Sequence, residues 1–190
     1  FSNRIVDIRT SDKNELVRVT GSPDSNAVTV LVQKITKHGR PDDTLMNKTY
    51  PRDLTRELRI YVSDGDDSVV VDAPHATVGL RVIAGKGHKA YNVIDSRRPL
   101  RLYARKHGAW YGDTARIRAH VSRDSAMTAF VPTDLYNTTM PLVTGAINAD
   151  DGIYLGLGAL YTGRQGFRKS PYSSRQQIIV SHAFSTEAFN

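Results

Sequence analysis

LRIYVSDGDDSVVV, beginning at Leu58, is the first of three stretches that start alike; LRVIAGKGHKAYNV follows at Leu80 and LRLYARKHGAWYGD at Leu100. In each stretch an alternating strand leads through a small or charged turn into a second alternating strand. The segment VDIRTSDKNELVRV from Val6 fits the same template more loosely. Two short strands per 20 or so residues are typical of a parallel β-helix or β-roll, whose stacked turns bury one core. Antiparallel hairpins of a β-sandwich would show the same sequence pattern. The sequence therefore predicts an all-β fold, which is either a stacked β-helix or β-roll or a β-sandwich.

The composition limits the class of protein. The 190 residues include 26 Lys and Arg, 19 Asp and Glu and no Cys, with a formal net charge of +7. This length permits one domain, or one domain with an appendage, around a buried core. The positive charge favours contact with anionic surfaces, and the lack of Cys excludes disulfides and thiol chemistry. The first residues contain neither an initiator Met nor a signal peptide, so we interpret the chain as a mature or excised fragment.

The chain divides into three parts. Residues 1–123 are predicted to form the β-rich domain, with a strand over 27–35 and a polar turn over 38–43. Short helices are expected at most around 51–58 or 122–130. Residues 124–150 contain two prolines and few charges, and they are predicted to be a linker. Residues 151–190 are predicted to supply two further strands.

The last part alternates apolar side chains over about ten residues. In GIYLGLGALYTG, residues 152–163, Ile153, Leu155 and Leu157 share one face. RQQIIVSHAFST, residues 175–186, is the expected partner strand, although His182 interrupts its apolar face. This alternation is the weak signature of a transmembrane β-strand, and a soluble hairpin fits the same letters.

Residues 147–189, INADDGIYLGLGALYTGRQGFRKSPYSSRQQIIVSHAFSTEAF, resemble the opening of the bacterial surface-antigen barrels, the BamA/TamA-like outer-membrane superfamily. In that superfamily a pDDGl.lGlg strand leads through a GFrk.PYas.h loop into a strand that ends fat.af. The upstream segments TRELRIYVSDGDDSVVVDAP and LRVIAGKGHKAYNVID resemble those that precede the barrel in one branch. That branch often carries a calcineurin-like phosphoesterase domain. Its metal-ligand motifs are absent here as an ordered set, so no phosphoesterase activity is carried over.

The resemblance implies a bacterial outer-membrane protein whose β-rich domain lies on the periplasmic side. The parent protein would insert or export proteins or other cargo, and this non-catalytic module would position or gate that traffic. The C-terminal strands would contact outer-membrane lipid or lipopolysaccharide, and two strands alone cannot close a barrel, which needs at least eight. Exposed strand edges would then pack on the domain or pair with another copy in a homo-oligomer.

The acidic turn of the first stretch is a candidate calcium site. It carries Asp64, Asp66 and Asp67. Calcium needs six to eight oxygen ligands, which a β-roll supplies from two stacked turns. The aligned turn carries cations instead, namely Lys86, His88 and Lys89. We therefore expect a structural corner in which Gly65 has a positive φ and the acids cap local amides, with no metal and no other cofactor.

A basic stretch follows, and its candidate anion-facing or lipid-facing residues are Arg97, Arg98, Arg101, Arg105, Arg116 and Arg118. On the strand from Leu100, Arg101 and Tyr103 share one face while Leu102 lies on the other. A solvated face and contact with lipid headgroups or lipopolysaccharide both explain this pattern. Interleaved aromatics also occur in single-stranded nucleic-acid sites, but no nucleic acid is expected as partner. The alternative to the outer-membrane function is a soluble β-roll that binds an anionic glycan, a lipid headgroup or nucleic acid.

Overall fold

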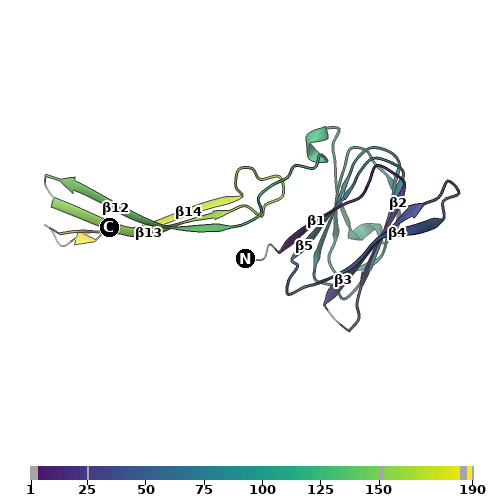
Figure 1. Ribbon diagram of the computed structural model, residues 1–190, viewed down its shortest axis with the longest axis horizontal. Helices are drawn as coiled ribbons and strands as arrows, with labels where there is room; N and C mark the ends of the chain where they lie inside the picture. The colour runs from purple at the N-terminus through teal and green to yellow at the C-terminus, as the bar shows by residue number, and fades with distance from the viewer. Residues whose placement is uncertain (1–3, 25, 150–151, 185–187, 190) are drawn as a thin grey trace. The chain divides into compact units, whose positions relative to one another are not determined.

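The computed structural model describes residues 4–24, 26–149, 152–184 and 188–189, which form two compact units (Figure 1). One unit spans residues 2–132 and the other residues 133–190. The described residues contain fifteen strands in three sheets and two short 3-10 helices, Thr114–Arg116 and Ser125–Met127. The predicted all-β class is therefore confirmed. No helix in the described ranges is long and apolar enough to cross a bilayer.

Two sheets build the first unit, which we call the two-sheet unit. The five-stranded sheet is parallel throughout and has the order β1 (Ile5–Arg9), β5 (Glu57–Val62), β7 (Gly79–Ala84), β9 (Leu100–Ala104), β11 (Ile117–Val121). The six-stranded sheet has the order β10 (Ala109–Gly112), β8 (Lys89–Ser96), β6 (Asp67–Ala73), β2 (Glu15–Gly21), β3 (Ala27–Ile35), β4 (Pro41–Pro51). Its first four strands are parallel neighbours, and β3 and β4 continue it as antiparallel neighbours. The predicted strand over 27–35 is confirmed.

Consecutive strands from β5 to β11 alternate between these sheets, so each strand from β7 onward lies beside the strand two before it in the chain. Leu58 is opposite Leu80 and Val82 is opposite Leu102 in the parallel register. Figure 1 shows β1 and β5 in one layer and β2, β3 and β4 in the other. The stretches that begin alike in the sequence thus place equivalent residues next to one another in the sheet.

The core of this unit lies between the two sheets. Alternate residues of each strand point inward, because side chains of a strand alternate between its faces. Leu58 and Ile60 from β5 pack in one cluster with Val69 and Val71 from β6, and all four are buried. Strand β9 shows the predicted alternation, with Leu102 buried and Arg101 exposed. This apolar layer fixes which side chains face outward.

The second unit contains one antiparallel sheet, which we call the C-terminal sheet. Its order is β12 (Thr138–Asn148), β13 (Gly152–Gly163), β14 (Ser174–Ala183), β15 (Ala188–Phe189). The pairing of β13 with β14 is the one that the alternation predicted. The prediction of a linker over 124–150 is wrong for the second half of that range, because β12 lies there and pairs with β13 along the whole length of β12. Pro141 and Gly145 interrupt the alternating pattern that is typical of a strand. The segment is nevertheless a strand, because β13 supplies hydrogen-bond partners along its length.

The helices expected from the sequence are nearly absent. Residues 51–58 form a turn that leads into β5, and only Ser125–Met127 is helical within 122–130. The side chain of Asp124 accepts a hydrogen bond from the Ala126 amide and caps this single turn. The segment then packs back on the two-sheet unit, where the Phe130 ring meets that of Tyr61 edge-on.

Candidate functional site

A row of four arginines crosses the five-stranded sheet on its outer face. They lie opposite one another in register on neighbouring strands: Arg59 on β5, Arg81 on β7, Arg101 on β9 and Arg118 on β11. Each follows a buried apolar residue that points into the core, so strand alternation directs each arginine outward. Like charges directly opposite one another destabilise a sheet unless an anion offsets them.

Glu57 is that anion for one half of the row. Its Oε1 accepts hydrogen bonds from the Nε atoms of Arg59 at 3.0 Å and Arg81 at 2.8 Å. Its Oε2 lies 3.7 Å from a guanidinium nitrogen of Arg101. Burial opposes ionisation of Glu57, but the hydrogen bonds and charges of Arg81 and Arg59 outweigh it and lower its pKa. Glu57 is therefore ionised at neutral pH and pairs with both buried arginines.

The row changes character along its length. The side chains of Arg59 and Arg81 are only 5% and 7% exposed, whereas that of Arg101 is 52% exposed. The Arg81 guanidinium also lies over the ring of Tyr103, which stacks on His120. The buried half is thus held by Glu57 and an aromatic face, and the exposed half opens to solvent.

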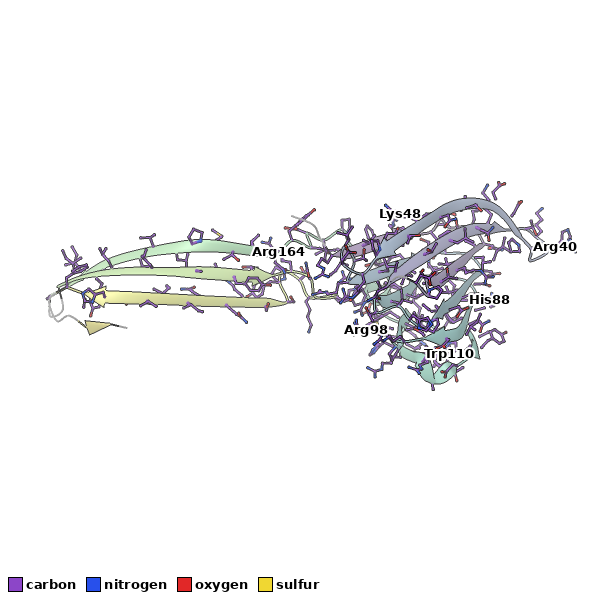
Figure 2. All side chains as sticks on the ribbon, turned by 90° about the horizontal axis from the view of Figure 1, so that it is seen from below. Arg40, Lys48, His88, Arg98, Trp110 and Arg164 are labelled. Carbon is purple, nitrogen blue, oxygen red and sulfur yellow. The ribbon has the colours of Figure 1, made fainter. Side chains whose placement is uncertain are left out.

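A pocket of about 380 Å³ lies at the exposed half, and we call it the arginine pocket. Its lining residues are Arg56, Glu57, Gly79, Leu80, Arg98, Pro99, Arg101 and Arg118. They come from the start of β5 and β7, from the turn before β9, and from β9 and β11. Figure 2 shows Arg98 at one end of the strands, while His88 lies at the other end. Four guanidinium groups therefore border one small space together with a single carboxylate.

Three of the six arginines singled out in the sequence meet in this pocket: Arg98, Arg101 and Arg118. Arg105 borders a different cavity of about 290 Å³ beside Asp64, Lys86 and Phe130. Arg116 forms an ion pair with Asp113 at 3.4 Å, and Arg97 is exposed outside the pocket.

Sequence reasoning missed Arg56, Arg59 and Arg81. The signal was present, because Arg59, Arg81 and Arg101 are each the second residue of a stretch that begins LR. Aligned strands of a parallel sheet place such equivalent residues side by side. By contrast, Tyr103 and Trp110, which interleave with arginines in the sequence, lie in different sheets.

The acidic turn at residues 63–67 joins neighbouring turns of the two-sheet unit. Gly65 has a φ of 105°, as predicted for the corner. The carboxylates of Asp64 and Asp66 accept hydrogen bonds from the amides of Lys86 at 2.9 Å and His88 at 2.8 Å. The expectation of local capping is wrong, because these amides belong to the next turn along the stack. These hydrogen bonds between the carboxylates of one turn and the backbone amides of the next therefore hold the two turns together.

Asp67 is buried and faces a cation. Its Oδ1 accepts a hydrogen bond from the Glu15 amide, and its Oδ2 accepts one from Lys89 Nζ. Lys89 Nζ also donates to the carbonyl oxygens of Ser63 and Gly65, both at 2.7 Å. Burial raises the pKa of Asp67, although the hydrogen bond from Lys89 opposes this shift. A lysine amine thus occupies the position beside Asp67 that a bound cation would need.

In the parts of the chain that the structure describes, no group of three or more His, Asp or Glu side chains could hold a metal ion. The candidate calcium ligands Asp64, Asp66 and Asp67 are all engaged by protein donors.

The C-terminal sheet exposes an apolar face, which His182 interrupts on β14. Val143, Leu157 and Val180 lie side by side across β12, β13 and β14 and are 77%, 68% and 58% exposed. Neighbouring rows on the same face add Ile147 beside Ile153. Comparisons with protein-family models, curated proteins and solved structures find no match. The candidate features are therefore interpreted from their own chemistry.

The opposite face of the C-terminal sheet is mixed, because large apolar side chains such as Leu142 and Ile179 lie beside a small polar row. Its central row consists of Thr144, Gly156 and Ser181. A Cβ atom at Gly156 would collide with the hydroxyl oxygen of Thr144, so this face is closely packed across the strands. The central rows of the two faces thus differ in polarity.

Proposed function

We propose that this chain is a non-catalytic module of a surface-antigen-type protein of the bacterial outer membrane. In this proposal the C-terminal sheet is the first part of a membrane barrel wall. The two-sheet unit is a stacked β-roll on the periplasmic side, where it positions or gates protein or other cargo that the parent protein inserts or translocates. The resemblance of residues 147–189 to barrel openings motivates the proposal.

The apolar face of the C-terminal sheet carries the proposal. Outer-membrane strands alternate lipid-facing apolar residues with polar residues on the other side. The row of Val143, Leu157 and Val180 and the row of Thr144, Gly156 and Ser181 follow this alternation on adjacent positions. An exposed apolar surface of this extent is unusual on a soluble monomer and marks a contact with lipid or protein. The alternating placement of β5 to β11 in two sheets supports the β-roll.

Flotation with phospholipid vesicles tests the membrane role. The full chain, refolded in the presence of vesicles, is expected to float with them in a density gradient. The variant Leu157→Asp with Val180→Asp is expected to remain at the bottom, because each carboxylate would have to enter hydrocarbon. Thr144→Asp with Ser181→Asp adds the same charge to the other face of the same sheet and is expected to float.

The fluorescence of Trp110, the single tryptophan, monitors folding of the two-sheet unit in both variants. Flotation that is equal for the two double variants would refute the assignment of the lipid-facing side. Failure of the unmodified chain to associate with any vesicle would refute the membrane role itself.

A further inference from the structure

The arginine pocket holds more positive charge than the protein neutralises. Both strong hydrogen bonds of Glu57 Oε1 go to the buried residues Arg59 and Arg81. Arg101 reaches the other carboxylate oxygen only at 3.7 Å. Within the described part of the chain, Arg56, Arg98 and Arg118 have no carboxylate within ion-pair distance. Of the four guanidinium groups that border the pocket, only that of Arg101 thus has a carboxylate partner among the described residues, and that contact is long.

The backbone holds two of these groups together. Arg101 and Arg118 are direct neighbours on the parallel strands β9 and β11, so their Cα atoms are about 4.8 Å apart. Arg98 enters from the turn before β9 and Arg56 from the residue before β5. Four separate backbone positions therefore direct positive charge to one space, and the repulsion between them is relieved when an anion binds there.

We infer that the arginine pocket binds a phosphate monoester group. Guanidinium groups pair with phosphate oxygens through two parallel hydrogen bonds. Several guanidinium groups are therefore matched better by a phosphate dianion, whose charge is spread over three oxygens, than by a single carboxylate. The volume of about 380 Å³ lies at the lower end for small-ligand sites, which suits a phosphorylated sugar or a lipid headgroup. This inference does not depend on the membrane role proposed above.

Gly79 leaves the pocket open. It is the first residue of β7 and lies opposite Glu57 in register. A Cβ atom at Gly79 would meet its nearest neighbour, the Arg56 carbonyl oxygen, at 3.5 Å, which is an ordinary contact. A side chain at this position is therefore tolerated by the backbone and takes up room between the arginines.

Isothermal titration calorimetry of the full chain at low salt, with inorganic phosphate and with glucose 6-phosphate, tests the inference. The double variant Arg98→Gln with Arg118→Gln is expected to lower the affinity at least tenfold. The matched control Arg97→Gln with Arg116→Gln removes the same charge from exposed positions outside the pocket and is expected to change the affinity less than twofold. Gly79→Glu, which adds a carboxylate to the pocket, is expected to abolish binding.

Vesicles distinguish the source of the phosphate. They are tested with the Leu157→Asp, Val180→Asp variant, in which apolar insertion is suppressed, so that headgroup binding is measured alone. Binding to phosphatidic acid in phosphatidylcholine vesicles, lost with the pocket variant, would assign a lipid monoester. Binding of glucose 6-phosphate alone would assign a soluble one, and either result supports the inference.

Three results would overturn it. One is equal loss of affinity in the pocket variant and its control, which would indicate general charge attraction. Another is citrate binding as tightly as the phosphate monoesters. The third is the absence of binding to inorganic phosphate, glucose 6-phosphate and phosphatidic acid vesicles at low salt. Because soluble phosphates require no membrane, these results are independent of the flotation experiment.

Discussion

The two units of this chain use the same strand alternation and direct it to opposite environments. In the two-sheet unit, alternate residues such as Leu58 and Leu102 are buried between two sheets, and the charged residues between them face outward. In the C-terminal sheet the corresponding apolar residues, such as Val143 and Leu157, are exposed, and the small polar residues pack closely across the strands. Alternation therefore fixes which residues share a face, but not which face is covered.

The two units also place their charges differently. The two-sheet unit buries Glu15, Asp67 and Lys89 at its turns and Arg59 and Arg81 on its sheet. The ion pair of Arg164 with Asp134 in the second unit is partly exposed. A buried ion pair that loses one partner costs far more than an exposed pair, so the two-sheet unit is expected to tolerate charge changes less well.

The largest effect is expected from Lys89→Met. This change removes the cation from Asp67, whose side chain is fully buried, and leaves two carbonyl oxygens without their donor. Breaking a buried ion pair from one side costs about 3–5 kcal/mol. We expect the free energy of unfolding, measured by urea titration of Trp110 fluorescence, to fall by about that amount.

Lys34→Met is the matched control for that prediction. Lys34 pairs with Asp43 at 3.0 Å on the same unit, but the two side chains are 50% and 69% exposed. The same substitution is expected to leave the urea midpoint unchanged. If the two variants unfold at the same urea concentration, the buried pair contributes no more than a surface pair.

The next effect compares one substitution across the two units. Leu102→Ala removes a side chain that is buried in the core and is expected to cost about 2–5 kcal/mol. Leu157→Ala removes an exposed side chain and is expected to change stability by less than about 0.5 kcal/mol in water. Hydrogen exchange read separately for β9 and β13 measures both. A comparable loss of protection at the two sites would show that the apolar face of the C-terminal sheet is covered in solution.

The fold was partly predictable because similar stretches of the sequence form neighbouring strands. The stretches from Leu58 and Leu80 align in register as their sequences align. Strand β12 was missed because Pro141 and Gly145 weaken its local pattern, and its pairing depends on β13, which lies later in the chain. A strand whose own residue pattern is weak is recognised only through the neighbouring strand that pairs with it.

The arginine pocket was only partly predictable for a related reason. Arg98, Arg101 and Arg118 stand out as a local concentration of charge, whereas Arg56 lies more than forty residues earlier in the sequence. The burial of Arg59 and Arg81 depends on Glu57, which contacts Arg81 from the adjacent strand. Which acid neutralises which arginine is a property of the register and not of any single segment.

A smaller effect is expected at the stacked glycines. Gly87 and Gly39 both have positive φ, at 93° and 75°. A Cβ atom at Gly39 would meet nothing within 4 Å, whereas one at Gly87 would collide with the carbonyl oxygen of Gly65 in the neighbouring turn. Gly39→Ala is expected to cost about 1–2 kcal/mol for the left-handed backbone alone. Gly87→Ala is expected to cost more in the same urea titration, and equal costs would contradict close stacking of the turns.

The most specific effect is expected from Glu57→Gln, because it should depend on pH. Arg81 and Arg59 lower the folded-state pKa of Glu57 below its ordinary value of 4.5. The ionised form therefore contributes its full stability above about pH 4.5, and this contribution is lost as the pH falls through the lower folded-state pKa. At pH 7 the variant is expected to lose about 1.5–3 kcal/mol, the range for hydrogen bonds to charged groups. Urea titrations of both proteins from pH 7 to pH 3 should show the difference narrowing at acid pH, and a difference that stays constant would mean that the charge of Glu57 does not hold the arginine row.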